Sequence, residues 1–144
     1  MPASFEEILN KPASEIKSPP AYPVGTYHCL VNGPLEHVKS SQKQTDGYRI
    51  KFKILSPRED VDQKTYTEQA LSGQDIIEDY WITEKSAWRL KELLTDHLGI
   101  DETNKKFLEL LAEAPGKQVY VKLKHEVTQD GKRTRHVVES TARV

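Results

Sequence analysis

The sequence predicts one mainly β domain with helices, in the element order β-β-β-α-α-β-β. Five segments alternate apolar and polar residues with a period of two, which is typical of a strand with one buried face. Two segments between the third and fourth strands space their apolar residues as an amphipathic helix does. Five strands with helix after the third is the connectivity of the OB-fold, a five-stranded Greek-key barrel. A two-layer α+β sheet has the same order and is the alternative.

The composition is that of a globular protein without staples or cofactors. The chain has 144 residues, of which 36% are hydrophobic and 30% charged, and this length can bury a sizeable core. The single cysteine, Cys29, excludes an intrachain disulfide, and no Cys/His cluster suits zinc. No apolar run reaches the ~18 residues of a membrane span, and the first residues lack the basic stretch of a signal peptide. We therefore expect an intracellular, cytoplasmic protein without membrane contact.

An N-terminal arm over residues 1–23 is expected to precede a domain over residues 24–144. Ser4–Glu7 fits a capping box, after which a short helix can form. Pro12 ends this helix, and further prolines keep the chain extended. The arm packs on the domain, docks on a partner or is disordered. In the packed case the helix would bury its apolar side chains, Phe5, Ile8 and Leu9.

The first two predicted strands have clear alternation. Residues 25–33 form the first strand, and residues 34–47 follow as a polar, lysine-bearing loop that ends in the turn signal Asp46-Gly47. Residues 48–55 form the second strand. Its apolar face holds Tyr48, Ile50, Phe52 and Ile54, as Tyr27, Cys29 and Val31 form that of the first.

The middle of the chain combines a long loop, a strand and a helix. Residues 56–74 are expected to be a polar, acidic loop, and residues 75–82 return to a strand. Thr83 caps a helix that ends near Leu98, where Gly99 suits the left-handed position that stops it. The buried stripe of this helix is Ala87, Leu90, Leu94 and Leu98.

A second helix and a hairpin complete the domain. The helix spans residues 104–113 and ends at Pro115-Gly116. The final strands, residues 118–128 and 134–142, are joined by the hairpin signal Asp130-Gly131. The residues that the second helix is expected to bury are Phe107, Leu108 and Leu111.

Charge is segregated along the chain although the net charge is only −1. Residues 39–53 hold five bases and one acid, and residues 114–144 hold seven bases and three acids. Residues 54–82 between them hold two bases and seven acids. Two basic blocks set against an acidic middle indicate a nucleic-acid partner.

Five short segments carry a resemblance to a known group of proteins: Pro23–Tyr27, Gly47–Phe52, Tyr80–Thr83, Ala87–Lys91 and Leu98–Ile100. In these the chain resembles phage-encoded single-stranded DNA-binding proteins with OB-folds. The resemblance implies sequence-tolerant binding of single-stranded DNA, with RNA as a possible ligand, during phage DNA replication or recombination in the host cell cytoplasm. Many replication proteins of this kind end in an acidic tail with a terminal aromatic residue, which Glu139–Val144 does not provide. A replication or recombination protein would then be recruited through the N-terminal arm or the acidic 54–82 segment.

The candidate interface follows from where OB-folds bind oligonucleotides, namely the outer face of the second and third strands and the loops beside it. Cations there contact phosphates, and exposed aromatic rings stack on bases. Trp81 is expected to point outward because Tyr80 shares a face with Ile82, and Tyr80 is the alternative platform. The predicted residues are Lys39, Lys43, Arg49, Lys51, Lys53, Trp81, Tyr120, Lys122, Lys124, Lys132, Arg133 and Arg135.

Catalytic and metal-binding alternatives have weak support. The five histidines lack metal-ligand spacing, and Glu59, Asp60 and Asp62 lack the glycine and spaced glutamate of a calcium loop. Cys29 has no base partner and is expected to be a buried thiol. Trp88 is expected to be a partly buried packing residue. The remaining alternative is a protein-binding adaptor or inhibitor on an OB or α+β scaffold, rather than an enzyme.

Overall fold

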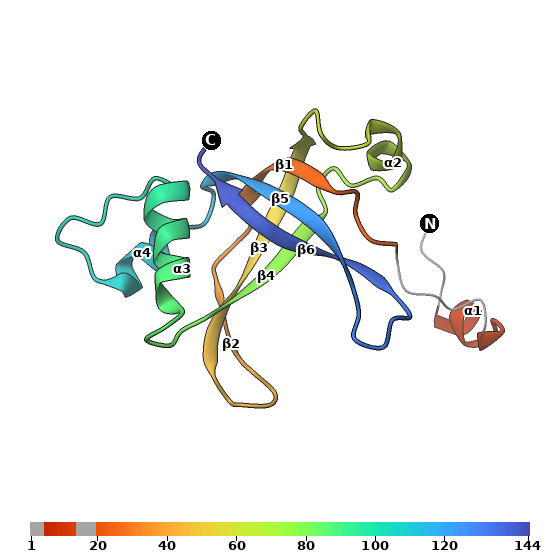
Figure 1. Cartoon of the computed structure of the whole chain (residues 1–144), viewed down its shortest axis with the longest axis horizontal. Coiled ribbons are helices and arrows are strands. Elements are labelled where there is room, and N and C mark those ends of the chain that lie inside the picture. The colour runs from red at the N-terminus through yellow and green to blue at the C-terminus, as the bar shows by residue number, and fades with distance from the viewer. Residues whose placement is uncertain (1–4, 14–19) are drawn as a thin grey trace.

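Six antiparallel strands form the body of the protein in a computed structural model, which describes residues 5–13 and 20–144. The sheet curves so that its strands cross one another in projection (Figure 1). The mainly β prediction is confirmed. The strands are β1 (Gly25–Val31), β2 (Glu36–Lys39), β3 (Asp46–Pro57), β4 (Asp75–Trp81), β5 (Gln118–Val127) and β6 (Thr134–Ala142).

The long strand β3 organises the sheet. Along one edge it pairs first with β2 and then with β1, and along the other edge it pairs with β4. Strand β1 continues to β5, and β5 to β6. Within the described residues β4 pairs with β3 alone and β6 with β5 alone, so backbone pairing leaves the sheet open between β4 and β6.

The predicted strands match the observed ones closely, with one strand missed. Residues 34–47 are not only a loop, because Glu36–Lys39 pairs with Asp46–Arg49 as strand β2. This strand has four residues, none of them fully buried. A strand that lies at an edge and faces water on both sides has no alternation to reveal it.

Three short helices and a π-helical turn accompany the main sheet: α2 (Gln63–Glu68), α3 (Ala87–Glu92), η2 (Leu93–His97) and α4 (Phe107–Glu113). Helices α3 and α4 lie together at one end of the sheet, and α2 lies beyond the end of β3, near the start of β1 (Figure 1). Gly99 has φ +74° and ends the α3–η2 segment as predicted. The predicted leucine stripe is buried: Leu90, Leu94 and Leu98.

The stretch 56–74 is a packed element, and its prediction as a polar loop is wrong. It contains α2, and Val61 and Leu71 on either side of this helix are only 3% and 2% exposed. Asp60 accepts hydrogen bonds from the backbone amide and the hydroxyl of Thr26, each at 2.9 Å. Val61 and Leu71 are isolated apolar residues in a polar stretch and show no periodicity, so the sequence pattern did not reveal that they are buried.

Other apolar side chains are more exposed than their patterns indicate. Asn104 has φ +58°, which a helix does not accommodate, and α4 begins later than predicted, at Phe107. This helix buries Leu110 and Leu111 and leaves Leu108 exposed. Trp88 is 58% exposed and is not a partly buried packing residue.

The N-terminal helix α1 (Phe5–Leu9) forms as expected but buries none of its residues. The capping residue Ser4 lies outside the described residues. Among those described, no helix has the length and apolar character needed to cross a membrane. The apolar side chains predicted to be buried are instead exposed: Phe5, Ile8 and Leu9.

Candidate nucleic-acid interface

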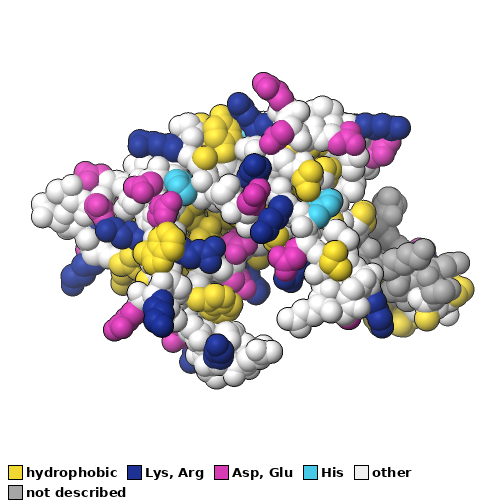
Figure 2. Space-filling model, viewed as in Figure 1, with side chains coloured by type: hydrophobic (Ala, Val, Ile, Leu, Met, Phe, Trp, Pro, Cys, Tyr) yellow, Lys and Arg dark blue, Asp and Glu magenta, His cyan; other side chains and the backbone are white. Residues whose placement is uncertain are grey.

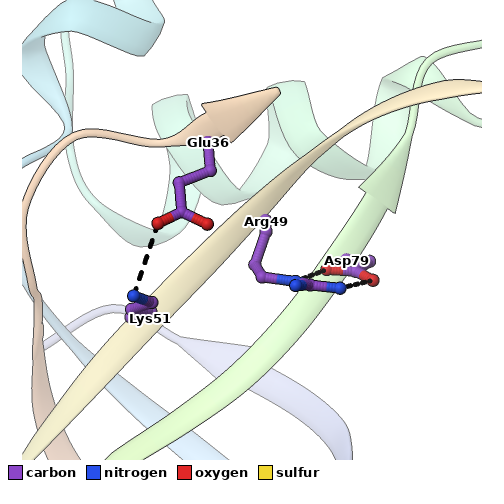
Figure 3. A network of polar contacts seen from close by, with 4 residues as sticks. All are labelled: Glu36, Arg49, Lys51 and Asp79. Carbon is purple, nitrogen blue, oxygen red and sulfur yellow. Dashed lines mark hydrogen bonds and ion pairs between the residues drawn. The ribbon is translucent and has the colours of Figure 1, made fainter. Parts of the chain in front are cut away.

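The outer face of β3 carries the predicted cations, and acidic residues of neighbouring strands meet two of them. Arg49 lies opposite Asp79 and donates from Nε and Nη2 to its two carboxylate oxygens, at 2.8 and 3.2 Å (Figure 3). Lys51 lies 3.4 Å from a carboxylate oxygen of Glu36 on β2 (Figure 3). The double contact raises the pKa of Arg49 above its usual value. Arg49 is therefore held by the protein itself.

Lys53 and Trp81 complete this outer face. Lys53 is exposed, and opposite it Asp75 accepts a 3.0 Å hydrogen bond from the side chain of Asn32. Trp81 is partly exposed, whereas Tyr80 beside it is buried at 9% exposure, as strand alternation predicts. The ring of Trp81 lies against Gly47, its partner on β3.

A groove of about 470 Å³ lies between the unpaired edges of β4 and β6, and we call it the β4–β6 groove. It brings together three of the predicted residues, Trp81, Lys124 and Arg135. A hollow separates the β2–β3 hairpin from the β5–β6 hairpin on the face shown in Figure 2. Three acids, Glu78, Asp79 and Glu126, also line the groove beside these cations, and Glu126 pairs with Arg135 at 3.0 Å.

Both hairpins that flank this hollow carry predicted cations. The β2–β3 hairpin holds Lys39 and Lys43, of which Lys39 lies 3.9 Å from Asp46. The β5–β6 hairpin holds Lys132 and Arg133, and Asp130 shapes its turn by accepting the backbone amide of Lys132 at 3.0 Å.

Tyr120 and Lys122 lie elsewhere on the sheet. Arg58 lies over the ring of Tyr120 at 4.8 Å and also donates to its hydroxyl at 3.2 Å. Tyr120 shares a row with His28 on β1 and Ser56 on β3. Ser56 is nine residues beyond the Gly47–Trp81 pair, about 30 Å of extended strand. The structure therefore does not place Tyr120 with Trp81 in one site.

Tyr22 and Glu78 lie at the β4–β6 groove but were not predicted as site residues. Tyr22 stacks on His136 of β6 at 4.1 Å, donates its amide to His136 Nδ1 at 3.0 Å, and accepts from His125 at 2.7 Å. Burial lowers the pKa of His136, mainly by desolvation, with a smaller effect of His125. Residues 20–23 of the arm thus pack on the domain, at one end of the β4–β6 groove.

Glu78 is an acid on the inner face of β4. It follows the parity of the buried Ile76 and Tyr80, and burial raises the pKa of its carboxyl to about 7. The guanidinium groups of Arg89 and Arg135 oppose this rise without cancelling it. Glu78 was not predicted as a site residue, because an acidic residue in a strand is normally assigned to the exposed face.

No family model matches this chain, and no curated protein matches it in sequence.

In the described part of the chain we find neither a metal-binding cluster nor an accessible cysteine. Residues 5–13 and 20–144 contain no group of three or more His, Cys, Asp or Glu side chains that could hold a metal ion. Asp62, one of the three acids considered for calcium, instead accepts the amide of Lys64 at the start of α2. Cys29 is fully buried as expected, and burial raises the pKa of its thiol to about 12.

Proposed function

We propose that this protein binds single-stranded DNA without strong sequence preference, on an OB-fold, and acts in phage DNA replication or recombination. The observation that carries the proposal is the position of Trp81. Its partly exposed ring lies on the outer face of β4, in the β4–β6 groove with Lys124 and Arg135, between two lysine-bearing hairpins. An aromatic platform beside cations is what sequence-tolerant single-strand binding requires.

The connectivity of the sheet also supports the proposal. Strands β3 and β4 correspond to the second and third strands of an OB-fold, and the β2–β3 and β5–β6 hairpins to the loops that flank its binding face. Strand β2 is then an extra pairing within the first of these loops.

The ion pairs set which cations reach phosphate. Lys51–Glu36 and Lys122–Glu139 are separated by 3.4 and 3.7 Å, and all four side chains are at least 40% exposed. Exposed pairs of this kind contribute about 0–1 kcal/mol, so a phosphate can displace the carboxylate. The two-point Arg49–Asp79 contact is harder to displace. The lysines, rather than Arg49, therefore supply the phosphate contacts.

The exposed apolar residues of α1 favour a second role as a docking element. Phe5, Ile8 and Leu9 follow helical i, i+3, i+4 spacing and are 78%, 44% and 65% exposed. A replication or recombination protein would bind this helix or the acidic 54–82 segment while DNA occupies the sheet. A chain that binds such a protein but no nucleic acid would be an adaptor.

Fluorescence anisotropy with labelled oligo-dT tests the proposed function. We expect saturable binding at low salt and a slope of log K against log salt of about −3, which is four or five phosphate contacts. Trp81→Ala should cost about 1–3 kcal/mol of affinity with little change in that slope. Leu108→Ala is the control, because it removes an exposed apolar side chain of α4 away from the β4–β6 groove. Absence of binding to oligo-dT and oligo-rU at low salt contradicts the proposal.

A further inference from the structure

A second cavity, of about 250 Å³, lies between β4, β6 and the α3–η2 segment, and we call it the α3 pocket. Its lining includes Glu78 and Tyr80 from β4 and Trp88 and Arg89 from α3. Hydrophobic, basic and acidic side chains lie next to one another beside α3 on the face shown in Figure 2. Because Glu78 lines both cavities, the α3 pocket adjoins the β4–β6 groove.

Glu78 differs from the neighbouring acids on β4, β6 and α3. Asp79 pairs with Arg49, Glu139 with Lys122, and Glu92 with His97 at 3.5 Å. Within the described ranges the carboxyl group of Glu78 forms no hydrogen bond or ion pair, and its oxygens are not sealed from solvent. The carboxylate is thus available to a ligand from within the pocket.

Arg89 and Trp88 provide the groups that Glu78 lacks. Arg89 is near enough to influence the charge of Glu78, yet it forms no ion pair with it. Trp88 is 58% exposed, so its indole can accept a stacked ring. An acceptor, a donor and an aromatic surface therefore share one pocket.

We propose that the α3 pocket binds a guanine base of the DNA strand, with Glu78 and Arg89 as the specificity-determining residues and Trp88 as the stacking surface. Guanine alone among the DNA bases has two adjacent N–H donors, N1 and N2, beside the carbonyl O6. A carboxylate accepts from both donors, and a guanidinium donates to O6. This inference rests on the proposed function, since the strand in the β4–β6 groove delivers the base.

The placement of an acid beside a DNA groove supports this assignment. A carboxylate repels phosphates, so it weakens strand binding unless base donors compensate for the repulsion. In a single strand the Watson–Crick edge is free for such contacts. Glu78 then adds a local preference for guanine to binding that is otherwise sequence-tolerant.

Competition binding with the full chain at a pH above 7, where Glu78 is mostly ionised, tests the proposal. The probes are oligo-dT and the same oligonucleotide with one central dG, dA, dC or deoxyinosine. We expect the dG strand to bind about tenfold tighter than dA or dC strands. Deoxyinosine, which lacks the N2 amine, should lose most of that gain. Glu78→Gln should abolish the dG preference and raise oligo-dT affinity, because it removes a charge that repels phosphates, whereas the control Glu139→Gln should keep the preference.

Each outcome separates the inference from the proposed function. Binding of oligo-dT with equal affinity for all central bases overturns the guanine pocket and leaves single-strand binding intact. Failure of every oligonucleotide overturns both. Guanosine monophosphate is a further probe: if it binds tighter than the dG strand, the source of the base is a free nucleotide and the proposal as stated is wrong. Circular dichroism of Glu78→Gln confirms that the variant is folded.

Discussion

The ring of Trp81 occupies the space that a side chain at Gly47 would need. The two residues are partners on β3 and β4, and a Cβ atom built at Gly47 would lie 2.5 Å from Cε3 of Trp81. Six of the seven glycines have a positive φ, and Gly47 is the exception. Its requirement for glycine is therefore steric and comes from the ring and the backbone beneath it.

Gly47→Ala should lower the free energy of unfolding by about 1–3 kcal/mol, since the ring must move. It should also weaken oligo-dT binding, because the displaced indole no longer forms the same platform. Urea unfolding measures the first effect. In a double-mutant cycle with Trp81→Ala, the cost of Gly47→Ala should shrink without vanishing, because the Tyr80 carbonyl oxygen also lies 2.7 Å from the added atom. Equal costs in both backgrounds contradict the packing described here.

Asp79→Asn should raise affinity for single-stranded DNA. The change frees Arg49 to contact a phosphate and removes one negative charge from the binding face. The salt slope should steepen by about 0.7, the value of one added contact on single strands. Lys53→Ala, which removes an exposed cation of the same face, should flatten the slope by a similar amount. An unchanged slope in both variants means that the strand does not cross β3.

Replacement of residues 58–71 by a Gly/Ser linker should unfold or strongly destabilise the domain, because it removes the buried Val61. Val61→Ala should cost about 1–3 kcal/mol and Leu71→Ala about 2–5 kcal/mol of unfolding free energy. Glu59→Ala, an exposed residue of the same stretch, is the control and should change stability by less than about 0.5 kcal/mol. A linker variant as stable as the parent would contradict the conclusion that this stretch is a packed element.

Glu78 should make stability fall as pH rises from about 4.5 to 7. The carboxyl has its usual pKa of 4.5 in the unfolded chain and about 7 in the folded one. Between these values the folded state binds more protons, so unfolding becomes easier as pH increases. The neighbouring Asp79 adds to the shift, while Arg89 on α3 and Arg135 on β6 reduce it.

Glu78→Gln should remove this dependence and, above pH 7, stabilise the protein by about 1–3 kcal/mol. Urea unfolding at pH values on either side of the window provides the measurement. The same experiment on Glu126→Gln, whose carboxylate is exposed and paired with Arg135, controls for a general effect of charge. Parallel pH profiles for the parent and Glu78→Gln contradict the assignment.

Alternation along the chain was sufficient to predict the central strands and their buried faces. Ile50, Phe52 and Ile54 are buried and Lys53 is exposed, as a period of two requires. Local patterns of this kind report only which face of a strand a residue occupies. They predicted that Tyr80 is buried and that Trp81 is on the outer face.

Contacts between distant segments could not be predicted in this way. Arg49 and Asp79 are thirty residues apart, and only the pairing of β3 with β4 reveals that one neutralises the other. The stacking of Tyr22 on His136 likewise joins the arm to the last strand. Tyr120 shared the alternation of the predicted cations, yet the sheet separates it from Trp81. A prediction of the interface from residue type alone therefore overestimates how many cations one strand of DNA can reach.

The rate at which Cys29, the one cysteine of the chain, reacts with a thiol reagent measures how often the folded domain opens. Cys29 is 0% exposed, and its pKa of about 12 keeps it unreactive while the sheet is intact. Modification by a thiol reagent therefore requires the core around Cys29 to open, as it does when β1 separates from its partner strands β3 and β5. The labelling rate, followed with and without oligonucleotide, reports how much a bound strand slows that opening without any introduced probe.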